Sequence, residues 1–202
     1  RDDVAVIPKP NSFHLRRLRK SDDAYVNHEP FHCELVPLRQ ATCPMFLGLH
    51  GSSKDDLWAV GEAGTAYRIV AADTDWPTLA VHDSRTFATL HGVWSGEYGD
   101  AWAVGGQGTI RHYTGSVERR FEYVESPVTT TLRAIWGSSK TDIWAVGDAG
   151  VVLHYDGATW SRVPLGGVAG KPDLFAVWAA SPSRVWAAGE GVLLQLSVKG
   201  GS

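Results

Sequence analysis

The chain has 202 residues, of which 44% are hydrophobic and 20% charged, as is usual for a globular domain. Its formal net charge of −3 argues against general affinity for nucleic acid, which needs a basic face. Its longest apolar runs fall well short of the roughly 20 residues that span a membrane. The chain begins at Arg1 rather than at methionine, which predicts a processed form or a fragment of a longer precursor.

The first part of the chain holds a loose strand and a cluster of metal-binding side chains. The strand is DDVAVIP, and the cluster is HEPFHC, in which His28, His32 and Cys33 are able to bind zinc or copper. Against a metal site, a strand would place His32 and Cys33 on opposite faces, and Pro30 prevents a helix. The alternative is a divergent repeat with surface histidines. Cys33 and Cys43 form either a disulfide or two unrelated thiols.

From residue 46 onward, one unit occurs four times. Its marker is a tryptophan that opens WAVGEAG, WAVGGQG, WAVGDAG and WAAGEG at Trp58, Trp102, Trp144 and Trp186, with spacings of 44, 42 and 42 residues. A fixed period near 42 residues indicates a repeat architecture. All nine tryptophans of the chain fall in three columns of this repeat.

Each unit reads as four short β-strands. In the third unit these are LRAIW, DIWAVG, GVVLHY and ATWSRVPL, and the DG after the third strand is a strong turn signal. Four strands in 40 to 45 residues is the size of a propeller blade, and the 3.6-residue period of a helical solenoid is absent. The sequence therefore predicts an all-β propeller of four-stranded antiparallel blades.

The blade count follows from the two ends of the chain. Tyr25 takes the place of the marker tryptophan in a shorter, divergent first blade over 9–45, followed by repeats at 46–89, 90–131, 132–173 and 174–202. The last repeat stops at its third strand, so we expect the strand at 3–8 to complete it, because propellers remove exposed edges in this way. The prediction is one domain, 1–202, with five blades.

The phrase GSSKTDIWAVGDAGVVLHYDGATW resembles the repeats of the BNR or Asp-box propellers. It is also similar to repeats of the photosystem II assembly factor family and of secreted myxobacterial propeller proteins. The matching residues are the WAVG core, Gly150, His154 and DGATW at 156–160. The resemblance implies a propeller with a secreted, periplasmic or cell-surface location, and it implies no single activity.

Several columns of the repeat are candidates for function. The WAVG tryptophans are expected to wedge blades together, and the aspartates two positions before them, Asp56, Asp100 and Asp142, to cap turns through their own backbone. Eight positions before the tryptophans stand His50, Trp94, Trp136 and Trp178. This aromatic column is either buried between blades or exposed on a rim that stacks on a ligand. Ten positions after the first three tryptophans stand Arg68, His112 and His154, which either face solvent or contact a ligand.

No catalytic signature accompanies these columns. The strands FLGLH, LHGVW, LRAIW and LFAVW, expected to be innermost, contain no acidic residue, whereas glycoside hydrolysis needs two carboxylates. The sequence therefore favours a non-catalytic, lectin-like module without a cofactor that recognises a carbohydrate or another ligand on the aromatic rim. The alternative is a protein-interaction scaffold, whose partner includes other parts of a precursor. A glycoside hydrolase or a metal-binding protein is less favoured.

Overall fold

The computed structural model describes residues 44–53, 55–70, 78–168 and 170–196, together with the backbone of four short strands before residue 33. The chain divides into two compact units, Arg1–Pro44 and Met45–Ser202. In the first unit, β1 pairs antiparallel with β4, and β2 with β3. The bounds of these strands are Ser12–Phe13 for β1, Arg16–Leu18 for β2, Tyr25–Asn27 for β3 and Phe31–His32 for β4.

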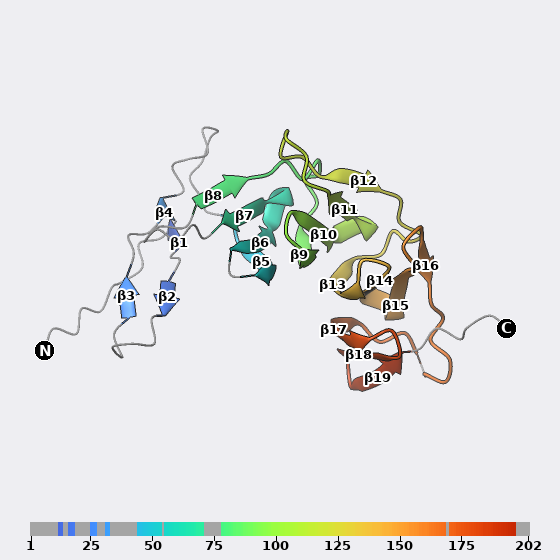
Figure 1. Ribbon diagram of the computed structural model, residues 1–202. Helices are drawn as coiled ribbons and strands as arrows, with labels where there is room; N and C mark the ends of the chain where they lie inside the picture. Colours follow the sequence, from blue (N-terminus) through green and yellow to red (C-terminus); the bar gives the residue numbers. More distant parts are fainter. Residues whose placement is uncertain are drawn as a thin grey trace, which may run out of the picture. The chain divides into compact units, whose positions relative to one another are not determined.

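The second unit holds four antiparallel sheets, formed one after another along the chain (Figure 1). The first sheet contains β5 (Phe46–Ser53), β6 (Asp56–Gly61), β7 (Ala66–Val70) and β8 (Thr78–Val81). The second contains β9 (Leu90–Glu97), β10 (Asp100–Gly105), β11 (Ile110–Tyr113) and β12 (Glu122–Val124). The third contains β13 (Leu132–Ser139), β14 (Asp142–Gly147), β15 (Val151–Tyr155) and β16 (Trp160–Arg162). The fourth contains β17 (Leu174–Ser181), β18 (Arg184–Gly189) and β19 (Val192–Leu196).

Each sheet is a simple meander in which every strand pairs with the next one along the chain. The predicted all-β class and antiparallel pairing are confirmed, and the WAVG phrase forms the second strand of each sheet. The strand expected at 3–8 lies outside the described residues. Nowhere in the described part of the chain is there a helix with the length and apolar character to cross a membrane.

The glycine that ends WAVG allows the second strand to approach the residue before the first strand. A Cβ atom on Gly105 would fall against the carbonyl oxygen of Thr89, and that same oxygen accepts the N–H of Gly106 at 2.9 Å. A single turn of 3-10 helix follows in the first three sheets: η2 (Glu62–Gly64), η3 (Gly106–Gly108) and η4 (Asp148–Gly150). The phrase therefore specifies a strand end and the tight turn after it.

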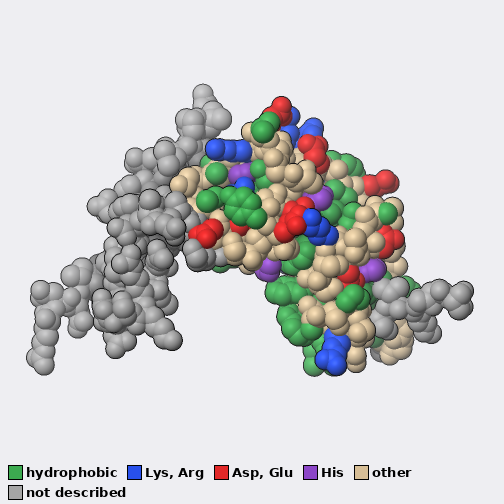
Figure 2. Space-filling model, in the orientation of Figure 1, with side chains coloured by type: hydrophobic (Ala, Val, Ile, Leu, Met, Phe, Trp, Pro, Cys, Tyr) green, Lys and Arg blue, Asp and Glu red, His purple; other side chains and the backbone are tan. Residues whose placement is uncertain are grey.

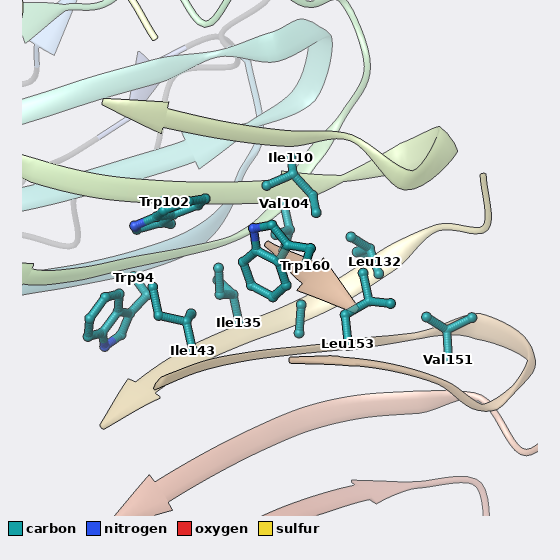
Figure 3. Packing of buried hydrophobic residues seen from close by; sticks show 11 residues of the cluster. Trp94, Trp102, Val104, Ile110, Leu132, Ile135, Ile143, Val151, Leu153 and Trp160 are labelled. Atoms are coloured by element: carbon teal, nitrogen blue, oxygen red, sulfur yellow. The ribbon is translucent and has the colours of Figure 1, made fainter. Parts of the chain in front are cut away.

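The hydrophobic core consists of three layers, each between consecutive sheets. The first strands β5, β9, β13 and β17 are neighbours in that order, so they are the innermost strands. Figure 3 shows the layer between the second and third sheets, where Trp102 and Trp160 pack with ring centroids 5.7 Å apart and Trp94 lies at one end beside Ile143. Face-to-face packing of apolar sheet surfaces is the main source of stability in such an array.

Candidate functional site

A polar network stands at the start of the second strand in each of the first three sheets. It is most complete in the third sheet, where the Asp142 carboxylate accepts hydrogen bonds from Nε1 of Trp144 at 3.0 Å and Nε2 of His154 at 2.8 Å. The hydroxyl of Ser138 also donates to this carboxylate. Because β14 and β15 pair Trp144 with His154, the two rings lie side by side on one face of the sheet.

The first and second sheets contain versions of the same network. In the second sheet, Nε2 of His112 donates to Asp100 at 2.9 Å while its ring stacks on the marker tryptophan, with centroids 3.8 Å apart. In the first sheet, Arg68 replaces the histidine, and its Nε donates to the buried Asp56 at 2.6 Å. We expected these aspartates to cap turns through their own backbone. In the structure they accept hydrogen bonds from side chains instead. Arg68, His112 and His154 each form a hydrogen bond with one of these aspartates, and ligand binding by them stays a prediction.

The network does not have the arrangement of a hydrolytic triad. In such a triad the histidine lies between the serine and the aspartate, because it takes the proton from the hydroxyl. Here Asp142 lies between Ser138 and His154 and accepts from both. The hydroxyl of Ser138 is therefore a donor to a carboxylate and is not activated as a nucleophile.

The aromatic column does not form one exposed rim. Trp94 is only 4% exposed and Trp136 is half-buried, with its indole N–H donating to the carbonyl oxygen of Ala179 at 2.9 Å. His50 is half-buried, and burial lowers the pKa of its imidazole, whose Nδ1 accepts the N–H of Ser95. Trp178 alone in this column has a largely open face, with 50% exposed. The expected stacking surface is absent at Trp94, and ligand binding by the column stays a prediction.

A second set of innermost-strand residues is more open, and sequence reasoning missed it. Each innermost strand carries a β-bulge next to its first residue, because the pairing skips one position there. The skipped residues are Leu47, His91, Arg133 and Phe175, which we call the bulge column. Bulges re-aim side chains and occur often beside functional sites. The signal in the sequence is that this inner-strand position differs in every repeat.

Arg133 interacts with two other members of the bulge column, His91 and Phe175. Arg133 forms two hydrogen bonds to Asp148, at 2.6 and 3.0 Å, which raise the pKa of its guanidinium. Its guanidinium carbon lies 6.0 Å from the ring centroid of Phe175, which is 52% exposed. Burial, and then the charge of Arg133, lowers the pKa of His91. The column combines exposed apolar groups with an oriented Arg133–Asp148 ion pair.

The other predicted site lies outside the described side chains. The side chains of His28, His32, Cys33 and Cys43 lie outside the described residues, so the metal site and the disulfide both stay predictions. Among the described side chains, no group of three or more His, Cys, Asp or Glu residues is placed to hold a metal ion.

Comparisons with known proteins identify the fold. No protein-family model and no curated sequence matches the chain. A solved structure described as YCF48 bound to D1 peptide is similar to it, with a TM-score of 0.61 and 18% identity, and the match covers 79% of this chain and about half (53%) of that one. The crystal structure of the computationally designed Ika4 protein is also similar, with a TM-score of 0.57, 14% identity and coverage of 77% and 92%. At these identities the likeness supports a propeller-like fold of antiparallel sheets.

Proposed function

We propose that the chain is a non-catalytic protein-recognition module that binds a peptide segment of a partner across the bulge column. The observation that carries this proposal is the set of bulges, which project one different side chain from each innermost strand. A site that repeats is suited to equivalent ligands, whereas a site whose members differ is suited to one defined partner. Aromatic residues and arginine are also the types enriched where protein interfaces gain most of their affinity.

The chemistry of the bulge column indicates the kind of peptide it would accept. Leu47 and Phe175 are exposed apolar groups on the first and fourth sheets. Between them lies Arg133, whose hydrogen-bonding groups are held in place by Asp148. We infer a partner segment with apolar side chains at both ends and a polar group between them. The YCF48 structure, in which a propeller-like chain holds a D1 peptide, supports a peptide as the ligand class.

Carbohydrate recognition has less support than the sequence suggested. It relied on aromatic faces exposed on one rim, but Trp94 is buried and the indole N–H of Trp136 is already bonded to Ala179. The five-bladed ring and the secreted or cell-surface location also stay predictions.

The proposal is tested by selecting ligands from a phage-displayed random-peptide library on the immobilised chain. We expect enriched peptides, measured in solution by fluorescence anisotropy, to bind Phe175→Ala and Arg133→Ala at least tenfold more weakly, about 1.4 kcal/mol. The melting temperature should stay close to the parent value, because both side chains are partly exposed. Val117→Ala, at a fully exposed turn of the second sheet, is the matched control.

Two outcomes would overturn the proposal. One is the absence of any enriched peptide, and the other is peptide binding that Phe175→Ala and Arg133→Ala leave unchanged. A parallel glycan array separates the alternatives, because glycan binding without peptide binding would favour the lectin-like function.

A further inference from the structure

The same contact between two equivalent positions of the repeat joins consecutive sheets at all three interfaces. The residue eight positions before each WAVG tryptophan, which we call the knob, contacts the residue seven positions before the tryptophan of the next sheet, which we call the seat. The knob and seat pairs are His50 with Ser95, Trp94 with Gly137 and Trp136 with Ala179. Every seat is a small residue facing a larger ring.

The contacts show why the seats are small. The Trp94 ring occupies the place where a Cβ atom on Gly137 would stand. At the next interface, the knob Trp136 comes close enough to donate its N–H to the carbonyl oxygen of Ala179 at 2.9 Å. A larger seat would push the ring away, and core packing tolerates such changes poorly.

The fourth sheet has a knob that no seat within the described part of the chain contacts. Trp178 is 50% exposed, and its cross-strand partner Trp186 is 38% exposed, whereas the WAVG tryptophans of the first three sheets are buried under the following sheet. Leu193 on β19 is exposed as well. Figure 2 shows hydrophobic side chains at the surface over this sheet. This face has the composition of a sheet-to-sheet interface and not of a solvent-facing surface.

The first sheet has the complementary feature, a seat that no knob from the described residues contacts. Gly51 occupies the seat position, where a Cβ atom would meet Asp56 and Leu57 of its own hairpin, and Leu49, two residues before Gly51, is 68% exposed. The residues equivalent to Leu49 in the later sheets, Val93, Ile135 and Val177, are all buried against the preceding sheet. The first and fourth sheets therefore expose the two halves of the interface that the chain forms internally three times.

We propose that copies of this chain associate head to tail, with the fourth sheet of one copy packed on the first sheet of the next. Trp178 packs over Gly51 and Leu57 of the neighbouring copy, and its N–H donates to the Gly51 carbonyl oxygen as Trp136 does to Ala179. Trp186 becomes buried beneath Leu49 and the strand beside it. This continues an interface that already exists, so it needs no new packing geometry. The contact is heterologous, because each copy uses two different surfaces.

The first unit of the same chain fits these two faces less well than a second copy does, because its residues do not follow the pattern of an aromatic knob and a small seat. In the alignment that places Tyr25 in the tryptophan column, the knob would be Arg17 and the seat Leu18, so the knob is not aromatic and the seat is not small. The register differs too: β3 pairs Tyr25 with Leu18, whereas the third sheet pairs Trp144 with the residue eight positions earlier. A second copy satisfies both positions.

A heterologous interface allows a complementation test. Trp178→Asp destroys the fourth-sheet face and leaves the first-sheet face intact, whereas Leu49→Asp does the reverse. Light scattering after size-exclusion chromatography should give the parent chain a mass above that of one copy, rising with concentration. Each variant alone should have the mass of a single chain. An equimolar mixture should form a dimer through the one intact pair of faces.

Controls keep the test decisive. Both substituted side chains are at least half exposed, so each variant should retain the circular dichroism spectrum of the parent. Val117→Asp, elsewhere on the surface, should associate like the parent, and Trp178→Ala provides a milder variant if the charged one does not fold. The proposal is overturned if the parent is a single chain at every concentration. It is also overturned if the parent associates but the mixed variants do not.

Discussion

At the level of single residues, the buried aspartates decide how the repeat is held together. Asp142 accepts from Trp144, His154 and Ser138 and is nearly buried, whereas Asp100 accepts from His112 and is more exposed. Asp142→Ala should lower the free energy of unfolding by about 2–4 kcal/mol, because it leaves buried N–H donors without an acceptor. Asp100→Ala should cost about 1–2 kcal/mol. Urea unfolding measures both, and equal losses would contradict this account of the network.

The buried His82 contributes to a dependence of the stability on pH. The ring of His82 packs against Trp58 and Tyr113, with centroids 4.7 and 4.9 Å away, and its Nδ1 bonds to the Ala80 carbonyl oxygen. Burial lowers the pKa of His82, nearby Arg68 and Arg119 lower it further, and the Ala80 bond and Asp56 oppose the shift. The unfolded chain, with a histidine pKa of about 6.5, therefore binds more protons than the folded chain in acid.

The sign of this effect gives a testable pH profile. The stability that neutral His82 contributes is present above about pH 6.5 and is lost as the pH falls through the folded pKa. The melting temperature should therefore fall below that pH, and His82→Phe, which cannot titrate, should make the fall shallower. Burial also lowers the pKa of His50 and His91, so part of the slope should remain. An unchanged slope in His82→Phe would show that other groups control the acid sensitivity.

At the level of the element, replacing a glycine in the turn after WAVG has two possible costs. One is the strain of a left-handed backbone, and the other is a steric clash of the added Cβ atom. Gly108 and Gly150 both have positive φ, +67° and +65°. A Cβ on Gly108 would fall against the carbonyl oxygen of Val128, whereas at Gly150 it meets only ordinary contacts with Lys171 and Leu165. Gly150→Ala should cost about 1–2 kcal/mol from the left-handed backbone alone. Gly108→Ala should cost clearly more, and thermal melts that rank them the other way would refute this explanation.

The repeat made the strands predictable, because residues at equivalent positions of the repeat occupy equivalent positions in each sheet. The innermost strands begin at Phe46, Leu90, Leu132 and Leu174, the positions aligned from the sequence alone. The environment of a column was less predictable. Trp94 and Trp178 occupy the same column, but Trp94 is buried and Trp178 is half-exposed, because among the described sheets one follows Trp94 and none follows Trp178.

The bulge column escaped prediction for a related reason. A search for repeated side chains passes over a position that differs in every unit. The bulge depends on how two strands pair with each other. The sequence of one strand, such as LRAIW, does not reveal that pairing. Arg133 and Phe175 are therefore recognisable as a pair only once β13 and β17 lie next to each other.

At the level of the whole molecule, the first and fourth sheets are the two ends of the row of described sheets. The fourth sheet leaves an apolar face and a strand edge exposed. Interfaces between consecutive sheets bury Trp58, Trp102 and Trp144 in turn. The fourth sheet contains three described strands, and β19 lies at its edge. An exposed strand edge is a site for pairing with another chain. The assembly and the stability of the protein therefore depend on what completes this edge and covers this face.

The last prediction concerns that edge. The sequence predicts that residues 3–8 pair with the last sheet as its fourth strand. If so, replacing DDVAVI at 3–8 by a Gly/Ser segment of equal length should leave β19 with an unpaired edge, lower the melting temperature and promote aggregation. The replacement keeps the length of the chain, so the loss is assigned to the strand. The same replacement at residues 197–202 is the control and should change the melting temperature less. An unchanged melting temperature would contradict the prediction that the N-terminal strand closes the ring. The fourth sheet would then be covered through the head-to-tail interface at Trp178 alone.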